Sequence, residues 1–461
     1  MTAHHPPLLP GPPGLALDLY HLDAAYVSWQ AGENQRSTFD LYTRSAPFDG
    51  TFMLVAGLEP ALDFVRNFHF APESLDYLRQ TRPYDPSFLE ELADFRFTGE
   101  ILAMPEGSIA FADEPLLRVT APFREALMLE SGLLHLIGVS TLIATKAARI
   151  TTAARGKPVS DFSFRRAQAP LLAARSAYIG GCVSTSLVAV AARYDIPTGG
   201  TIPHALVQLF PDEAAAFRAV AESLPHYTLL LDTYDVHRAI ATAIDVAQDV
   251  NNRLGHTLEA VRLDSGDLVA DSIHVRAALD TAGLREVHIL ASGDLDEWVI
   301  TDLLGTGAPI DGFGVGSRMG LGLGSLEHGV AAEALGAVYK LVWTEGEAND
   351  GARIKLAGAK TTWPGRKQIY RRGTYKEDII QLESEPPPAG STPLLESVIR
   401  NGNLVAPSPP LAAIRKTGIE ALDAFPSQYQ TLADPTPHPV TWSEQLQRLR
   451  DEATARYEPT S

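Results

Sequence analysis

The middle of the chain alternates apolar runs with helical stretches, and this alternation constrains the fold more than any other feature of the sequence. Each apolar run ends in polar or glycine residues. The runs TLLL, EAVRL, VHILA and IDGFGV end at residues 232–234, 264–266, 292–294 and 314–316. Strands that alternate with helices imply βαβ units and a parallel sheet. We therefore predict an irregular α/β barrel, in which chemistry gathers at the carboxyl ends of the strands.

The remaining pattern predicts how the chain is divided. Helices with regular apolar spacing are predicted at residues 127–149, 236–254, 268–282, 295–304 and 442–457. Further strands are predicted at residues 337–343, 352–357 and 368–371. We expect a flexible tail at residues 1–14, an N-terminal α+β domain at 15–130, the barrel with the active site at 131–335, and a C-terminal segment at 336–461 that completes the flanking domain.

Composition and charge exclude several classes of protein. The chain carries 38 basic and 56 acidic residues and a formal charge of -18, which argues against a nucleic-acid or membrane-surface binder. An anionic substrate would need local basic groups. The only cysteine is Cys182, so we expect no intramolecular disulfide, no thiolate zinc site and no iron–sulfur cluster. With no secretion signal and no apolar run long enough for a membrane span, a cytoplasmic protein is expected.

Two motifs carry groups that suit a flat anionic ligand. In DFSFRRAQ, at residues 161–168, an aromatic residue is followed by paired guanidinium groups. The aromatic face can stack on a heteroaromatic ring, and the guanidinium groups match a carboxylate or a phosphate. Arginine pairs also occur on solvated helices. GGTIPHA, at residues 199–205, offers backbone N–H groups to an anion, and His204 suits a general base or a phosphate acceptor. The alternative is that His204 is an ordinary surface histidine in a loop.

Two further motifs lie at predicted strand ends. In VRLDSGDL, Asp264 suits hydrogen bonds from ribose hydroxyls, a bound Mg²⁺ or positive charge on a sugar ring, with a helix N-cap as the alternative. ASGDLDEW and DGFGVGSR are glycine-rich turns that suit phosphate binding by backbone amides, with tight-turn glycines as the alternative.

Taken in order, these motifs resemble the nicotinate phosphoribosyltransferase family and its close relative, nicotinamide phosphoribosyltransferase. The resemblance spans most of the chain. It runs from Asp18-Leu19-Tyr20 and Pro47-Phe48-Asp49-Gly50 to the helix at Glu130, through DFSFRRAQ, GGCVSTS, GGTIPHA, LLDTYD, RLDSGD, ASGD and GFGVGS, and then to KLAGAKTTWPGRKQIYR at residues 355–371.

The resemblance implies a type II phosphoribosyltransferase fold and a homodimer with shared active sites. The pyridine ring would lie between Phe162 and a Tyr20 from the other subunit. Arg165, with Arg166 as the second candidate, would meet nicotinate and phosphate, while Arg262 and Asp264 would face ribose and pyrophosphate. Further substrate-binding candidates are Ser184, Thr185 and Thr201, and the 5′-phosphate candidates are Ser292, Gly293, Gly314, Gly316 and Ser317.

The implied reaction joins nicotinate to phosphoribosyl pyrophosphate in NAD biosynthesis or salvage. By the resemblance, His204 is phosphorylated transiently by ATP as a co-substrate, Mg²⁺ is required, and the catalytic residues are His204, Asp264 and Arg165. As pyrophosphate leaves, C1 of the ribose gains positive charge and the pyridine nitrogen attacks. Positioning and charge stabilisation would therefore dominate catalysis.

Several positions depart from the family pattern. Ser163, Leu187 and Ala205 replace the usual glycine, asparagine and serine. At Val183 the nicotinamide-using relative carries an acidic residue, so an apolar side chain there favours nicotinate.

Three alternatives stay open. The first is a nicotinamide phosphoribosyltransferase, and the second is a catalytically lapsed relative that binds nucleotides as a sensor. The third is a metal-dependent lyase built on Asp232, Asp264 and Asp294, although no histidine accompanies these carboxylates.

Overall fold

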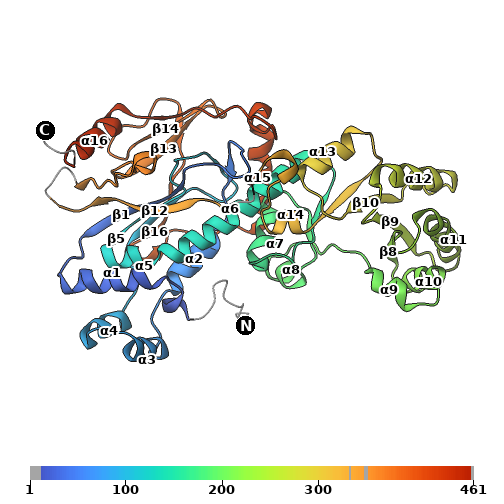
Figure 1. Ribbon diagram of the computed structural model, residues 1–461, viewed down its shortest axis with the longest axis horizontal. Helices are drawn as coiled ribbons and strands as arrows, with labels where there is room; N and C mark the ends of the chain where they lie inside the picture. Colours follow the sequence, from blue (N-terminus) through green and yellow to red (C-terminus); the bar gives the residue numbers. More distant parts are fainter. Residues whose placement is uncertain (1–11, 332–333, 347–350, 458–461) are drawn as a thin grey trace. The chain divides into compact units, whose positions relative to one another are not determined.

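The computed structural model describes residues 12–331, 334–346 and 351–457, and these form two compact units (Figure 1). Unit 1 contains the described residues up to 145 and those from 334 onward, and unit 2 contains residues 146–331. The first junction differs from the predicted boundary at residue 130. It lies inside one continuous helix, α6 (Glu130–Ala153), and a helical pattern alone gives no sign of where one unit ends.

Most of the predicted N-terminal tail lies outside the described residues. Its last two residues, however, belong to the short 3-10 helix η1 (Pro13–Leu15), in which Gly14 is buried. A Cβ atom at Gly14 would lie 2.4 Å from the backbone oxygen of His69. This glycine therefore packs against the folded chain, and the predicted tail extends too far.

Unit 2 is built on a parallel six-stranded sheet with the order β7-β6-β11-β10-β9-β8. Its strands are β6 (Val159–Asp161), β7 (Ser184–Thr185), β8 (His226–Leu230), β9 (Thr257–Leu263), β10 (His288–Ser292) and β11 (Gly312–Val315). The pairing of β11 with β6 brings the last strand beside the first, as in a barrel. Because β7 and β8 are the two edges of the sheet, the ring is open there, and the predicted α/β fold is confirmed as a curled half-barrel.

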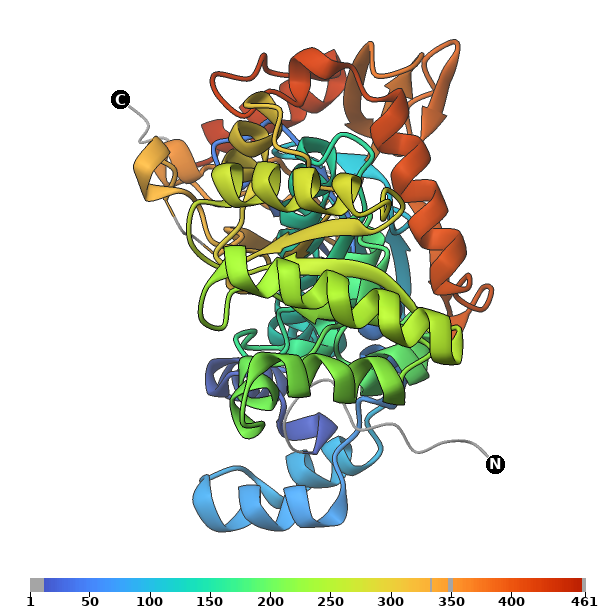
Figure 2. The same ribbon diagram turned by 90° about the vertical axis from the view of Figure 1, so that its right-hand side faces the viewer.

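Helices cover one face of this sheet. Figure 2 looks onto α10, α11 and α12, with the strands behind them. The helices of unit 2 are α7 (Pro170–Ile179), α8 (Val188–Tyr194), α9 (His204–Leu209), α10 (Glu213–Ser223), α11 (Val236–Leu254), α12 (Leu268–Thr281), α13 (Glu297–Gly305) and α14 (Ser317–Gly320). Val261 and Leu263 of β9 are buried in the core beneath the helices. Because side chains alternate along a strand, Arg262 points to the opposite, inner face.

In unit 1, strands from both ends of the chain form one six-stranded sheet with the order β12-β1-β5-β3-β16-β17. Strand β1 (Arg36–Thr43) lies antiparallel to β12 (Ala337–Thr344) and to β5 (Leu117–Pro122). The paired residues Ser37 and Thr344 are 307 positions apart in the sequence. The predicted flanking domain, built from both termini, is therefore confirmed.

The other elements of unit 1 surround this sheet. Its helices are α1 (Leu19–Gln30), α2 (Leu58–Asn67), α3 (Pro72–Thr81), α4 (Pro86–Ala93), α5 (Phe123–Met128), α15 (Leu411–Ala424) and α16 (Glu444–Ala455). Its remaining strands are β2 (Met53–Leu54), β3 (Glu100–Ala103), β4 (Ile109–Ala110), β13 (Lys367–Arg372), β14 (Glu377–Leu382), β15 (Ser391–Pro393), β16 (Glu396–Arg400), β17 (Asn403–Leu404) and β18 (Val440–Trp442).

The strand predicted at residues 352–357 is wrong. Only Ala352 forms a bridge, with Trp343. Beyond it, the backbone of Lys355 pairs with Thr362. The Lys355 N–H donates to Thr362 Oγ1 at 2.9 Å, and the Lys355 carbonyl oxygen accepts from the backbone N–H of Thr362 at 3.1 Å. The alternating pattern is present, but pairing with β12 reaches only Arg353, whose backbone N–H donates to the carbonyl oxygen of Val342 at 3.0 Å.

Helix α6 is the one helix among the described residues that is long and apolar enough to cross a membrane by length and composition. However, 83% of its apolar window is buried inside the protein. Core helices of globular proteins pass the same test of composition, so this helix gives little support for a membrane span.

Candidate functional site

A small cavity of about 50 Å³ lies on the inner face of the half-barrel in unit 2. Five of the residues singled out from the sequence line it, namely Phe162, Thr201, Arg262, Ser292 and Gly314. Four of them come from the carboxyl ends of β9, β10 and β11 and from the residue after β6. The convergence follows from the parallel sheet, because such ends meet at one edge.

Arg262 connects the polar groups around this cavity. Its Nε donates a hydrogen bond to Ser292 Oγ, and its Nη1 donates to Thr201 Oγ1, both at 2.7 Å. Its Nη2 donates to the Asp264 carboxylate. The guanidinium carbon lies 5.9 Å from the centre of the Phe162 ring, within reach of a cation–π contact. One arginine thus presents positive charge beside an aromatic face.

The Asp264 carboxylate is ionised and half-buried. Burial alone would raise its pKa, but hydrogen bonds from Ser292 and Arg262, together with the Arg262 charge, bring the pKa below its ordinary value. The N-cap alternative is wrong for this residue. Asp267 caps α12 instead, since its side chain accepts from the backbone N–H groups of Val269 and Ala270.

His204 is the first residue of α9 and stands next to this network. Its Nε2 lies 3.8 Å from Asp264 Oδ2, and its Nδ1 lies 3.2 Å from Thr233 Oγ1. The side chain is 39% exposed, so a substrate can reach it. The structure therefore brings the predicted histidine and aspartate together.

Two of the predicted phosphate-binding glycines are required by close packing. Gly293 has a φ of 91°, and a Cβ atom there would lie 2.0 Å from the backbone oxygen of Asp264. A Cβ atom at Gly314 would lie 2.3 Å from the Phe162 ring. Gly316 and Ser317 follow β11 at the start of α14. Both turns thus lie at the carboxyl ends of neighbouring strands, where backbone N–H groups can meet a phosphate.

Other predicted residues do not line the cavity. Arg165 and Arg166 are exposed in the turn after β6. Ser184 donates a hydrogen bond to Ser160 Oγ at 2.8 Å, and Thr185 is buried. Tyr20 belongs to unit 1, where its hydroxyl lies 3.5 Å from Glu130 Oε1.

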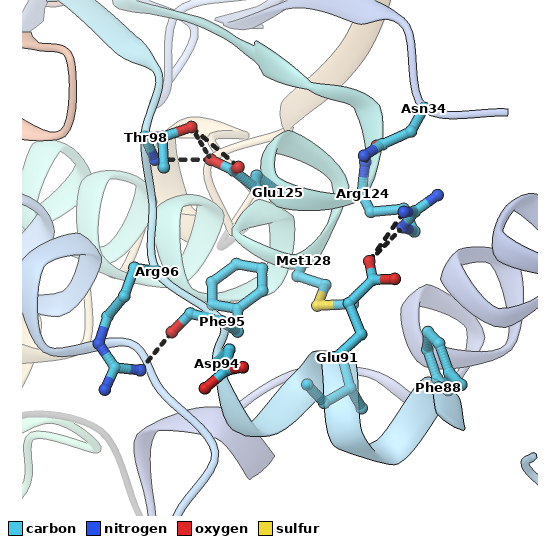
Figure 3. Close-up of a pocket in the computed structure, with 11 residues that line it drawn as sticks. Asn34, Phe88, Glu91, Asp94, Phe95, Arg96, Thr98, Arg124, Glu125 and Met128 are labelled. Carbon is cyan, nitrogen blue, oxygen red and sulfur yellow. Dashed lines mark hydrogen bonds and ion pairs between the residues drawn. The ribbon is translucent and has the colours of Figure 1, made fainter. Parts of the chain in front are cut away.

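A second cavity, of about 250 Å³, lies in unit 1 beside α4 and α5 (Figure 3). Four of its polar side chains form two pairs. Arg124 donates to Glu91 through two nitrogens, and Thr98 donates to Glu125 through its backbone N–H and its hydroxyl. The smaller cavity, with its glycine turns and clustered strand-end residues, is the better candidate site.

Comparison with known proteins decides the family. Two family models match the chain: the nicotinate phosphoribosyltransferase N-terminal domain at residues 15–138, and the C-terminal domain at residues 388–450. Nicotinate phosphoribosyltransferase pncB2 of Mycobacterium tuberculosis (strain ATCC 25618 / H37Rv) is 38% identical over 459 residues, which cover 97% of this chain and 96% of that protein. The chain belongs to the nicotinate phosphoribosyltransferase family.

Other members of the family match at similar length. The nicotinate phosphoribosyltransferase of Bacillus subtilis (strain 168) is 35% identical over 95% of this chain and 95% of its own length. The crystal structure of human nicotinic acid phosphoribosyltransferase superposes with a TM-score of 0.82 at 29% identity, and it covers 94% of this chain and 99% of that one. The resemblance of the motifs to the family is therefore confirmed over nearly the whole chain.

The structure accommodates one departure from the family pattern. Ser163 is buried, and a Cβ atom at Gly320 would lie 2.2 Å from the Ser163 Cβ. The added side chain at position 163 thus occupies space that Gly320 leaves open. Leu187 is buried at the start of α8, and Ala205 is exposed on α9.

Two residues near the site were not predicted from the sequence. Ser160 lines the cavity, and Thr233 contacts His204. The position of Thr233, directly after the apolar run of β8, could have identified it. Ser160 alternates with the buried Val159, but β6 is only three residues long, which is too short for a reliable period-two pattern.

Proposed function

We propose that this chain is a nicotinate phosphoribosyltransferase, which joins nicotinate to the ribose of phosphoribosyl pyrophosphate in NAD biosynthesis or salvage. The observation that carries the proposal is the convergence of Phe162, Arg262 and Ser292 on one cavity, with Asp264 accepting hydrogen bonds from the last two. Family membership across nearly the whole chain supports it.

The roles follow from the chemistry of these groups. Phe162 offers an aromatic face to the pyridine ring, and Arg262 attracts the anionic donor. As pyrophosphate leaves, its departing oxygen takes the C1–O bond pair, and the pyridine nitrogen supplies the pair for the new C1–N bond. The ionised Asp264 carboxylate stabilises the positive charge that builds up on the ribose between these events.

The residues at the strand ends fit a Mg²⁺ ion that arrives with the donor. Asp232 Oδ1 is buried without a hydrogen-bond partner, while Oδ2 accepts from the backbone of Asp264 and from Ser265. Mg²⁺ commonly uses one or two carboxylates together with substrate phosphates and water. Asp232 and Asp264 would hold the ion, and it would neutralise charge on the pyrophosphate.

ATP coupling through His204 is part of the proposal. A ring nitrogen of His204 takes the terminal phosphoryl group of ATP, ADP leaves, and the phosphohistidine changes the electrostatic grip on pyrophosphate. The closeness of His204 to Asp264 supports this role. We expect ATP to stimulate the native enzyme, and His204→Ala to keep a slow reaction that ATP no longer stimulates.

Nicotinate is proposed as the base because Val183 is apolar and 38% exposed, with no carboxylate to repel the acid. The carboxylate of nicotinate would meet Arg165 or Arg166, which are both exposed. The test is to supply purified protein with phosphoribosyl pyrophosphate, Mg²⁺ and either base, with and without ATP, and to identify the product. Exclusive use of nicotinamide would overturn the base assignment, and no product from either base would support a sensor.

A cytoplasmic homodimer with shared sites completes the proposal. Tyr20 is 57% exposed on α1, and Leu19 and Val27 are also exposed there, which suits cover by a second copy. Mixing Tyr20→Ala and Phe162→Ala subunits tests the sharing. Random mixed dimers hold one intact site, so about a quarter of the native activity should return. A mixture that stays as inactive as its parents would contradict a shared site.

A further inference from the structure

Asp161 is a buried carboxylate that has no role in the site described above. It is the last residue of β6, and the residue is 1% exposed. Oδ1 accepts a hydrogen bond from the backbone N–H of Ser163 at 2.9 Å, and Oδ2 accepts from Thr185 Oγ1 at 2.7 Å. A carboxylate kept this far from water needs such partners.

The Asp161–Thr185 pair also holds the neighbouring loops. The carbonyl oxygen of Asp161 accepts from Ser186 N at 2.9 Å, and Thr185 Oγ1 accepts from Leu187 N at 3.1 Å. The carbonyl oxygen of Thr185 accepts from Gly199 N at 3.0 Å, at the start of the GGTIPHA loop. One buried pair thus links the loops after β6 and β7 to the loop that leads to Thr201 and His204.

Phe162 lies between the two residues that this network fixes. Its own N–H donates to the carbonyl oxygen of Val315 at 2.8 Å, and its ring packs against the bare Cα of Gly314. The orientation of the ring therefore depends on the backbone from Asp161 to Ser163.

We propose that Asp161, through Thr185 and the backbone of Ser163, is a positioning residue that sets the orientation of the Phe162 ring for nicotinate. It acts on the base through Phe162 and does not touch the substrate. The inference rests on the proposed function and extends it by one residue. Burial raises the pKa of Asp161 while the hydrogen bonds from Ser163 and Thr185 oppose the rise, as expected of a carboxylate in a closed site.

The test measures KM for nicotinate and for phosphoribosyl pyrophosphate separately in Asp161→Asn, Thr185→Val and the double variant. Each single variant should raise KM for nicotinate about tenfold, which corresponds to about 1.4 kcal/mol. KM for phosphoribosyl pyrophosphate should change less than about twofold, because the link from Thr185 to Gly199 and the Thr201 loop is made by backbone groups, which both substitutions keep. The double variant should resemble the single ones, because both remove the same interaction.

Thr185→Ser keeps the hydroxyl and should restore a KM for nicotinate close to the native one. Thr38→Val is the matched control, since Thr38 Oγ1 lies 2.9 Å from Thr120 Oγ1 in the buried part of unit 1. This variant should lose stability without changing either KM.

Equal rises in both KM values, additive effects, or a Thr185→Ser variant as weak as Thr185→Val would overturn the positioning role. If Asp161→Asn fails to fold, the Thr185→Val and Thr185→Ser pair decides the matter. An inactive native enzyme would instead contradict the proposed function.

Discussion

The two units use the same kinds of charged side chain in different ways. In unit 1, Asp40 pairs with Lys367 at 2.8 Å, and the two side chains are 0% and 5% exposed. In unit 2, Arg262 pairs with Asp264, but these side chains are 13% and 28% exposed, and Arg262 lines a cavity. A closed pair can only hold the fold, whereas an accessible pair can also bind a substrate.

The closed pairs of unit 1 join segments that are far apart in the sequence. Lys367 lies on β13 and Asp40 on β1, and Arg118 of β5 donates to the backbone oxygen of Lys367. Unit 2 has a closed cluster as well, in which Lys146 and Arg149 contact Glu297. The contrast is therefore between buried and accessible charged groups. Each prediction below changes a residue in the buried interior or at the accessible site.

The largest expected effect is on stability. Lys367→Met leaves the Asp40 carboxylate buried without its charged partner, which should lower the free energy of unfolding by about 3–5 kcal/mol. KM for nicotinate should not change in the protein that folds. Denaturant unfolding measures the loss. Lys416→Met breaks an exposed pair with Glu420 and serves as the control, with an expected change below about 1 kcal/mol. Similar losses in both variants would remove the distinction between closed and exposed pairs.

The next effect is on catalysis. Asp264→Asn keeps the shape but removes the charge beside the ribose, so kcat should fall about 10²–10³-fold. Steady-state kinetics and thermal unfolding together show whether the variant loses activity while it keeps its stability. Asp267→Asn is the matched control three positions away, because asparagine caps a helix as well as aspartate does. Full activity in Asp264→Asn would contradict its role.

A smaller effect is expected from packing at the site. Gly314→Ala places a methyl group against the Phe162 ring, and such overpacking costs about 1–3 kcal/mol. KM for nicotinate should rise while kcat changes less. Gly305→Ala, where an added Cβ meets nothing within 4 Å, should leave both constants unchanged. Equal behaviour of the two variants would mean that the ring position does not limit nicotinate binding.

The smallest effect, counted per unit of pH, concerns the pH dependence of stability in unit 1. Burial, together with the nearby Asp378 carboxylate, raises the pKa of Glu114 well above its ordinary value. The folded state then holds a proton that the unfolded state releases, so stability should fall as pH rises above the ordinary carboxyl range. Glu114→Gln should flatten this decline by at most about 1.4 kcal/mol per pH unit, as measured by unfolding from pH 5 to pH 8.

Asp378 provides the opposite sign as an internal control. Burial would raise its pKa, but the neighbouring His438 imidazole and the hydrogen bonds from Arg371 lower the pKa to about 2. The contribution of Asp378 to stability is present above the pKa of about 3.9 that an unfolded aspartate has, and it is lost as pH falls toward 2. The Glu114→Gln variant should still lose stability in this way at low pH. An unchanged slope above pH 5 would show that Glu114 is ionised in the folded state.

The sequence by itself determined the local pattern and which strand ends carry polar side chains. The helix predicted at residues 236–254 is α11, and the strand ends carrying Arg262 and Asp264 were identified without coordinates. Both rest on periods of 3.6 or two residues, which side-chain burial imposes over a short stretch of chain. The ordered motifs also indicated the family.

Only the tertiary structure decided which residues meet. It showed that Asp267 and not Asp264 caps α12, that Thr233 contacts His204, and that Asp161 is buried against Thr185. It also left the sheet of unit 2 open between β7 and β8, and it paired only the start of residues 352–357 with a strand, through Ala352 and Trp343. Such outcomes depend on contacts between distant segments, and a local pattern of apolar and polar residues does not specify the partner.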